Sequence, residues 1–333
     1  MREEILSFLR KKKNFTSGEE ISREMGITRS AVWKNIQKLR SQGYQIESVK
    51  HHGYLLVEAS ELFNEFEIKE VLLSVPELSK ISLYYYDQID STNQAARRAS
   101  EQQAPEWSLF VADSQTAGRG RLGRSWHSIA GVGLWFSILL RPQAEPARLA
   151  TLTLYVGLAA AKAVRAATGL DIAIKWPNDL VIMPSGQKIS GILTEVILEE
   201  FHVQAAIIGI GINVNTADFP QDIRDSATSL LLAGGRKLSR LKILQEVLTE
   251  IKVGYEDFLR SLEQPDPAWL NEYARLCATL GRKVFIKNRD GQMVEGTAAE
   301  ITATGDLAVE LPDGKKIVCH SGEVSVRGLL GYV

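Results

Sequence analysis

The spacing of apolar residues changes twice along this 333-residue chain, near residues 60 and 280, and these changes constrain the fold most strongly. Apolar residues first recur at helical spacing, then form longer runs typical of buried strands, and finally form short runs separated by turns. A single hydrophobic core rarely serves so long a chain. The sequence therefore predicts an N-terminal domain at 1–60, a connector at 61–80, a central domain at 81–280 and a C-terminal domain at 281–333.

The N-terminal domain is predicted to contain three short helices and a hairpin. The second helix starts at Ser17, which is followed three residues later by Glu as in a capping box, and it stops at Gly26. Thr28 caps a third helix, and strand-like runs follow at 45–49 and 54–57. Three helices followed by a hairpin are typical of a winged helix-turn-helix domain.

Charge is divided unevenly along the chain. Residues 1–53 contain 11 Lys and Arg against 6 Asp and Glu, a net charge of +5, whereas the rest contains 28 against 34, a net charge of −6. A basic N-terminal head, residues 1–53, followed by an acidic remainder indicates that the head binds a polyanion. We therefore expect it to bind DNA, with protein binding as the alternative. The third helix is expected to contact DNA through Thr28, Arg29, Ser30 and Lys34.

The central segment alternates strand-like and helical runs, and the last segment contains only short strand-like runs. Buried strands are expected at 108–113, 132–140 and 203–214, and an alanine-rich helix at 148–168. Several hairpin-like connections favour a mixed α+β domain with a mostly antiparallel sheet. The strands of the last segment, which include 324–327, are spaced as in a small β-barrel.

The two cysteines and the hydropathy pattern indicate where such a protein works. Cys277 and Cys319 lack the spacing of a metal site, and a secreted disulfide-rich chain would contain more cysteines. No run approaches about 18 consecutive apolar residues, so neither a signal peptide nor a membrane span is expected. We therefore expect a cytoplasmic protein with two inert thiols and no membrane contact.

A loop rich in glycine and arginine is the strongest local signal. Residues 118–126 read GRGRLGRSW, so Arg119, Arg121 and Arg124 lie among three glycines. Glycine lets the backbone approach a ligand closely, and arginine binds carboxylate or phosphate oxygens. The letters also match the dinucleotide fingerprint, but that motif requires a helix directly after it, and here a strand is expected at 132–140. The loop therefore predicts an anion site, with a solvated basic loop as the alternative.

Three further segments place polar or charged residues next to predicted strands. Residues 175–180 read KWPNDL, where Asp179 is placed to hold Mg²⁺ or accept a proton, unless the segment is an ordinary Asn-Asp turn. Residues 188–195 read KISGILTE, in which Lys188 begins a mostly apolar strand or is simply an exposed strand end. Residues 209–215 read GIGINVN, and glycines inside a strand mark either a close ligand approach or a bulge.

Together with the STN sequence at 91–93, these motifs resemble those of the biotin protein ligase family. The glycine-arginine loop and KWPNDL are the most specific elements, and the resemblance covers essentially the whole chain. The winged helix and the terminal barrel resemble the bifunctional class that joins a ligase to a repressor, which implies an SH3-like fold for the barrel. The segment 217–230, expected near adenine, is not distinctive, so none of its residues is assigned.

The resemblance implies a reaction in two steps. Biotin reacts with ATP, in the presence of Mg²⁺, to give biotinyl-5'-adenylate, and biotin then passes to a lysine of a carboxylase carrier domain. The resemblance also implies a homodimer that represses a biotin operon by binding operator DNA, with biotinyl-adenylate as corepressor. The alternatives are a ligand-sensing repressor without ligase activity and a related ligase that uses lipoate or octanoate.

The functional residues of the family carry over to the matching positions of this chain. Catalytic roles fall to Lys188, Arg121 and Asp179, and Asp179 is also the expected ligand of Mg²⁺. Biotin is expected to contact Ser91, Thr92, Asn93, Gln115, Arg119, Gly120, Arg121 and Lys188. ATP and the adenylate are expected to contact Arg119, Arg121, Arg124, Trp126, Asn178 and Asn213.

Overall fold

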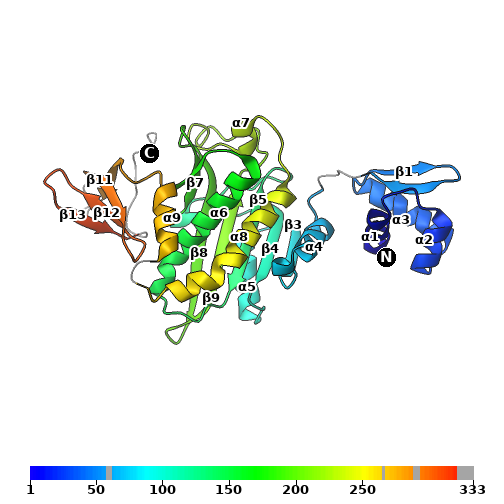
Figure 1. The fold of residues 1–333 in the computed structure, drawn as a ribbon, viewed down its shortest axis with the longest axis horizontal. Helices are drawn as coiled ribbons and strands as arrows, with labels where there is room; N and C mark the ends of the chain where they lie inside the picture. Colours follow the sequence, from blue (N-terminus) through cyan, green and yellow to red (C-terminus); the bar gives the residue numbers. More distant parts are fainter. Residues whose placement is uncertain (58–61, 265–266, 288–292, 321–333) are drawn as a thin grey trace. The chain divides into compact units, whose positions relative to one another are not determined.

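The computed structural model describes residues 1–57, 62–264, 267–287 and 293–320 (Figure 1). The chain divides into two compact units, Met1–Glu67 and Ile68–Val333, and each is described by itself.

The first unit contains three helices and a two-stranded antiparallel hairpin, as the sequence predicted. The hydroxyl of Ser17 accepts from the Glu20 amide, and Gly26 ends that helix in the left-handed region, so local capping fixes the helix as expected. Buried aliphatic side chains from all three helices form its core. The elements are α1 (Arg2–Lys12), α2 (Gly18–Met25), α3 (Arg29–Ser41), β1 (Ile46–Val49) and β2 (Gly53–Leu56).

The predicted connector contains secondary structure of its own. A helix, α4 (Glu65–Ser74), is followed by a 3-10 turn, η1 (Pro76–Leu78). Ile68 and Leu72 lie one turn apart on α4, and both are buried because they share one face.

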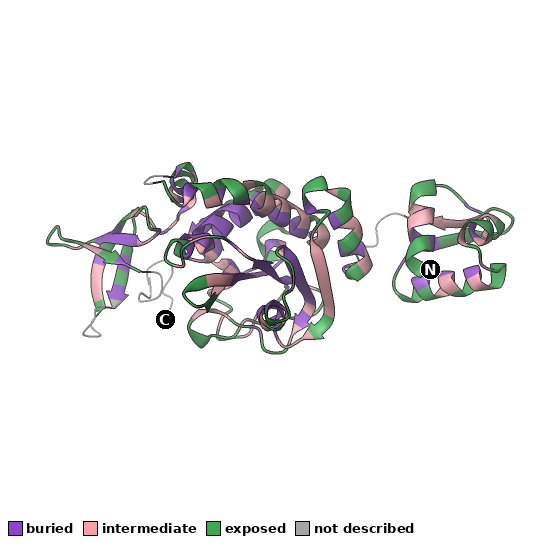
Figure 2. Cartoon of the chain, turned by 90° about the horizontal axis from the view of Figure 1, so that it is seen from below, coloured by how far each residue is buried: buried purple, intermediate pink, exposed green. Residues whose placement is uncertain are grey.

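The second unit is built on a seven-stranded sheet in the order β3-β4-β5-β9-β8-β7-β6 (Figure 1). Only the β3–β4 pair is parallel, which confirms a mixed α+β domain with a mostly antiparallel sheet. The strand β5, third in this order, is buried along its whole length, and buried strands, purple in Figure 2, lie inside the second unit. The strands are β3 (Ser82–Ile89), β4 (Ser108–Gln115), β5 (Leu134–Leu140), β6 (Ile172–Lys175), β7 (Asp179–Ile182), β8 (Lys188–Glu199) and β9 (His202–Ile212).

Helices cover both faces of this sheet. Side chains alternate along β8, so Gly191 faces the loop at Trp126, whereas Ile192 faces α6 through Gly157. The helix α5 packs on the same face as the loop, because Gly209 of β9 abuts Asn93 near the start of α5. The helices are α5 (Thr92–Glu101), α6 (Leu152–Thr168), α7 (Leu230–Gly234), α8 (Arg240–Ser261) and α9 (Ala268–Leu276).

One helical segment, Arg148–Thr168, is long and apolar enough to cross a membrane by length and composition alone. However, 72% of the apolar window is buried inside the unit, where α6 packs on α8, α9 and the sheet. Such burial is typical of a helix in the core of a folded unit.

The C-terminal segment forms an antiparallel sheet in the order β10-β11-β12-β13. Among the described residues no pairing joins β10 to β13, so the predicted closed SH3-like barrel is not confirmed. The strand expected at 324–327 lies outside the described residues. Both Cys277 and Cys319 are buried. The strands are β10 (Lys283–Lys287), β11 (Met293–Ile301), β12 (Leu307–Glu310) and β13 (Lys316–Cys319).

Candidate active site

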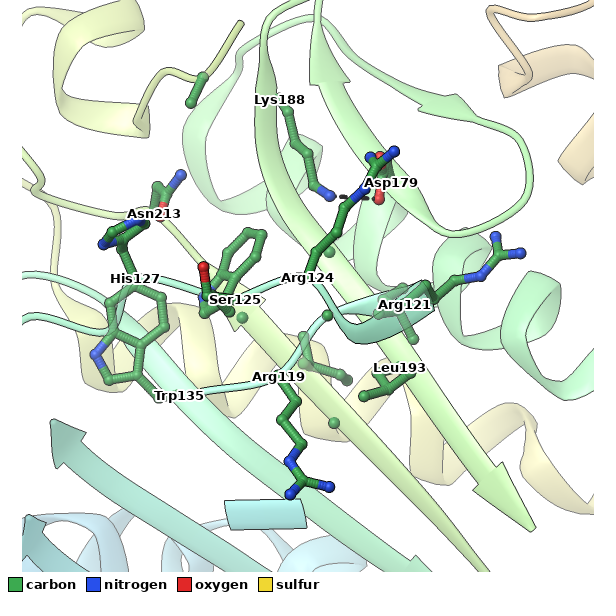
Figure 3. A pocket seen from close by; sticks show the side chains of 18 of the residues that line it. Arg119, Arg121, Arg124, Ser125, His127, Trp135, Asp179, Lys188, Leu193 and Asn213 are labelled. Carbon is green, nitrogen blue, oxygen red and sulfur yellow. Dashed lines mark ion pairs between the residues drawn. The ribbon is translucent and has the colours of Figure 1, made fainter. Parts of the chain in front are cut away.

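A cavity of about 500 Å³ opens on the face of the sheet that carries α5 and the glycine-arginine loop (Figure 3). Residues far apart in sequence line it, because the ends of β4, β7, β8 and β9 meet there. All the side chains that the sequence placed around biotin and ATP lie in this lining: Ser91, Thr92, Asn93, Gln115, Arg119, Gly120, Arg121, Arg124, Trp126, Asn178, Asp179, Lys188 and Asn213.

The floor of the cavity is made of two glycines that face each other across β8 and β9. Gly191 pairs with Gly211, and the indole of Trp126 lies over both. A Cβ atom at Gly211 would lie 2.4 Å from Trp126 Nε1, and one at Gly191 would lie 3.1 Å from the same ring. The ammonium of Lys188 lies 5.2 Å from the ring centroid of Trp126. The glycines therefore form a slot for the indole, which no other residue type leaves open.

A hydrogen-bonded polar wall closes one end of the cavity. Gln115 Oε1 accepts from the Thr92 amide at 2.8 Å, and Gln115 Nε2 donates to Ser128 Oγ at 2.7 Å. The fully buried Ser137 Oγ lies 2.7 Å from Thr92 Oγ1. Ser91 begins α5 without using its own hydroxyl as a cap, and it lines the cavity.

Asn93 lies behind this wall, and both ends of its side-chain amide are engaged. Its Oδ1 accepts from Ser137 Oγ at 2.6 Å, and its Nδ2 donates to Glu195 Oε2 at 2.7 Å. Arg97 pairs with the other oxygen of Glu195 at 3.3 Å. A Cβ atom at Gly209 would lie 2.1 Å from Asn93 Oδ1, so glycine is needed there. This geometry favours a supporting role for Asn93 over direct contact with a ligand.

The other end of the cavity is strongly cationic. Lys188 Nζ lies 2.7 Å from Asp179 Oδ1, and Arg121 Nη1 donates to Asn178 Oδ1 at 2.9 Å. Arg124 points toward the Lys188–Asp179 pair, whereas Arg119 points the opposite way (Figure 3). Lys188, Arg121 and Arg124, together with Lys175, thus line this part of the cavity beside the carboxylate of Asp179, which favours anionic ligands.

Burial strengthens this electrostatic preference. It lowers the pKa of the Arg121 guanidinium, and Asp179 opposes that effect. Burial also lowers the pKa of Lys175, which Asp179 raises and the nearby cations Lys188 and Arg124 lower further. Because the cations disfavour one another, an anion placed among them relieves their repulsion.

The glycine-arginine loop is closed by its own backbone hydrogen bonds. The Gly120 amide donates to Arg124 O at 2.7 Å, and the Trp126 amide donates to Gly118 O at 2.9 Å. A Cβ atom at Gly118 would lie 2.4 Å from Trp126 O. The glycines therefore let the loop fold back tightly, which turns the side chains of Arg121 and Arg124 toward the strand ends.

Sequence reasoning missed several residues that line the cavity. The sequence assigns no role to Lys175 within its motif and none to the segment 217–230, although this segment supplies Phe219, Pro220 and Ile223. Asn213, expected to meet adenine, donates instead to Thr228 O at 3.1 Å and so holds the far end of this segment. No motif marks the segment, and its lining residues include both polar and apolar side chains.

The acidic and other metal-binding side chains in the described part of the chain bear on the predicted magnesium ligand. No group of three or more His, Cys, Asp or Glu side chains gathers there to hold a metal ion. Asp179, the predicted ligand, already pairs with Lys188.

The predicted DNA contacts all lie at the start of α3 and are exposed. Thr28 Oγ1 accepts from the Ala31 amide at 3.2 Å as the helix cap, and it lies 3.0 Å from Ser30 Oγ. Arg29 and Lys34 carry the positive charge of this surface.

Comparison with known proteins agrees with this geometry. The biotin/lipoate A/B protein ligase family matches residues 85–213, and a helix-turn-helix domain family matches residues 2–55. The bifunctional ligase/repressor BirA of Bacillus subtilis is 38% identical over 94% of each chain, and that of Escherichia coli is 30% identical over 94% of this chain and 93% of its own. The biotin protein ligase of Aquifex aeolicus, solved with biotin and ATP, superposes with a TM-score of 0.61 at 31% identity, covering 74% of this chain and 99% of that one. The chain therefore belongs to the biotin protein ligase family, among its bifunctional ligase/repressors.

Proposed function

We propose that this protein activates biotin with ATP to biotinyl-5'-adenylate, transfers biotin to a carrier lysine, and represses transcription through its head. The observation that carries the first part is the single cavity that joins a neutral polar wall to a cluster of cations around Lys188. It offers hydrogen bonds to an uncharged ring at one end and binds anions at the other.

The first step must bring a carboxylate and a triphosphate together. Their repulsion, and the charge that develops at the α-phosphate, require fixed positive groups at the point of reaction. Lys188 serves as the point charge between the two anions, and Arg121 and Arg124 hold the phosphates. Ser91, Thr92 and Gln115 bind the ureido ring of biotin, whereas Arg119 binds the joined product.

The nucleotide lies toward Trp126 and the segment 216–227. The flat indole and the apolar residues Phe219 and Ile223 suit an adenine ring. Mg²⁺ arrives with ATP as part of the substrate, because Asp179 is paired with Lys188 and the described chain holds no group of three or more His, Cys, Asp or Glu side chains that could hold a metal ion.

The second step requires a neutral amine from the carrier lysine. Lysine has a reference pKa of about 10.4, so a nearby carboxylate that accepts its proton speeds the attack. Asp179 is the carboxylate of the cationic cluster, and it becomes free for this role when the anionic adenylate takes over its contact with Lys188. Attack then releases AMP.

The ligase reaction is tested by incubating the protein with biotin, MgATP and a purified carboxylase carrier domain. Mass spectrometry should find the carrier heavier by one biotinyl group, and lipoate or octanoate in equal amount should not compete. A carrier that stays unmodified would leave only a ligand-sensing repressor, and preferential loading of lipoate would point to the related acyl ligase.

Replacing Arg121 with glycine is expected to release the adenylate from the cavity. The variant loses the hydrogen bond to Asn178 and one buried cation beside the phosphate, worth about 2 kcal/mol. Its adenylate should dissociate roughly tenfold or more faster and biotinylate unrelated proteins. Rapid gel filtration with radiolabelled biotin measures retention, and Arg165→Gly, a surface ion-pair arginine, is the control. Equal retention of the adenylate by both variants would contradict the proposal that Arg121 holds its phosphate.

Replacing Glu195 with alanine tests the support behind the polar wall. The change removes the acceptor of Asn93 Nδ2, so Thr92 and its partners lose their alignment. The KM for biotin should rise about tenfold while the KM for ATP stays constant. Glu195→Gln keeps an acceptor oxygen and should restore most of the affinity. Similar changes in both KM values, or no rescue by glutamine, would show a merely structural role.

Repression is assigned to the first unit because it carries the basic charge and the helix-turn-helix. One winged helix reads one half-site, so the protein binds DNA as a homodimer. The adenylate acts as its corepressor, and the protein works in the cytoplasm. Deleting residues 1–60 should abolish DNA binding in a mobility-shift assay and leave ligation within about twofold of the full chain. Loss of ligation as well would show that the head supports the active site.

A further inference from the structure

The tryptophan of α3 is exposed in a way that the other tryptophans are not. The chain has six tryptophans, and five of them are buried or half-buried, whereas Trp33 is 54% exposed. Its neighbour Val32 points into the core of the first unit with Ile36 and Leu39. Trp33 therefore projects from the outer face of α3, where it adds little to the stability of the unit.

The surroundings of Trp33 are polar and basic. Ser30 precedes it by three residues and Gln37 follows it by four, so both share its face of the helix. Lys34 is exposed directly beside it, and Arg29 is exposed one turn before it. An apolar ring at the centre of hydrogen-bonding and cationic groups is an arrangement suited to contact, because it combines a desolvated centre with a charged rim.

The net positive charge of the first unit indicates which kind of partner binds this face of α3. Residues 1–53 carry 11 basic and 6 acidic side chains, so a polyanion is attracted and a basic protein surface is repelled. An α-helix fits the major groove of B-form DNA, where thymine alone presents a methyl group. Cations on the rim meet phosphates, which fix position, whereas an apolar ring gains nothing from phosphates.

We propose that Trp33 is a sequence-reading residue, which packs its indole against thymine methyl groups in the major groove while Arg29 and Lys34 bind the backbone. This inference rests on the proposed repressor function and assigns the part of it that discriminates among sequences. The predicted contacts Thr28 and Ser30 then act mainly to begin the helix, since their hydroxyls are engaged with its first turn.

The test uses the full chain with biotin and MgATP. Wild-type protein first selects duplexes from a random library, and the best of these serves as the specific probe against a scrambled duplex. The ratio of specific to non-specific affinity should fall about tenfold in Trp33→Ala and much less in Trp33→Phe. Substitution at an exposed position should leave the unit folded, which its circular dichroism checks.

The salt dependence of DNA affinity distinguishes apolar contacts with bases from ionic contacts with phosphates. An apolar contact releases no counterions, so the slope of log affinity against log salt concentration should be unchanged in Trp33→Ala. Lys34→Ala should weaken both duplexes alike and reduce the slope by about 0.9. Trp33→Lys should increase the slope and still lose discrimination. An unchanged affinity ratio in Trp33→Ala and Trp33→Lys would overturn the proposal.

Iodide quenching locates the ring directly. The difference in quenching between wild type and Trp33→Phe reports the accessibility of Trp33, and the specific duplex should protect it. Protection that appears without DNA would mean that a second copy or another part of the chain covers this face, which also overturns the proposal. If the wild-type protein enriches no duplex at all, the repressor function itself fails, so the two failures are distinguishable.

Discussion

Alanine at position 188 is expected to slow formation of biotinyl-adenylate by about 100- to 1,000-fold, the usual effect of removing one group that stabilises developing charge. Lys188 lies in the cavity, 2.7 Å from Asp179 and over the Trp126 ring. Its loss removes the cation that we propose lies between the two reacting anions, and it leaves the carboxylate of Asp179 without this partner. Pyrophosphate release in a single turnover measures the step.

The matched control is Lys162→Ala, because Lys162 is also ion-paired, with Glu250 and Glu272, but lies outside the cavity. It should retain the wild-type rate. The double variant Lys188→Ala/Asp179→Asn should react faster than Lys188→Ala alone, since it removes the carboxylate left without a partner. A Lys188→Ala enzyme within tenfold of wild type would refute the central role of this lysine.

Alanine at position 211 is expected to reduce adenylate formation about 100-fold without unfolding the protein. The new Cβ would lie 2.4 Å from Trp126 Nε1, so the indole must leave its slot. Displacement of a binding group by about 1 Å typically costs a factor of that size. Affinity for ATP should fall more than affinity for biotin, because Ser91 and Gln115 lie at the other end of the cavity.

Gly157→Ala is the control for this change. A Cβ there would meet only Ile192 Cδ1 at 3.8 Å, an ordinary contact, and alanine stabilises a helix interior by about 0.5–1 kcal/mol. The variant should melt slightly higher and keep full activity, as differential scanning calorimetry and the ligation assay would show. Comparable losses in both variants would mean that the slot at Gly211 has no special function.

Local chemistry explains why much of the fold was predictable. The caps at Ser17 and Thr28 and the left-handed Gly26 depend on residues within one turn, and the structure confirms the helices that they bound. The glycine-arginine loop was also recognisable from the sequence, because its glycines and arginines are adjacent, and the structure places its arginines in the cavity lining. Trp33 was given no role from the sequence, although its position one residue after Val32 places it outside the buried stripe of α3.

The parts of the fold and of the site that were not predictable depend on contacts between residues that are distant in sequence. The insertion of β9 between β5 and β8 follows from the packing of the whole sheet, and no single segment encodes it. Asn93 and Glu195 are separated by 102 positions, so only the folded chain shows that they are partners. The apolar side chains Phe219 and Ile223 resemble ordinary core residues until the chain brings them to the cavity.

An indole connects the C-terminal sheet to the segment 175–180 of the candidate active site. Trp176 Nε1 donates to Gly305 O at 3.0 Å, and the Trp176 amide donates to Thr279 Oγ1 at 3.0 Å, two residues before the site pair of Asn178 and Asp179 begins. Gly305 has a left-handed backbone and sits against Thr151 and Leu154 of the core. Anyone who builds chimaeric ligases by exchanging the last segment must therefore transplant this glycine turn intact, because a foreign turn would alter catalysis even where every cavity residue is kept.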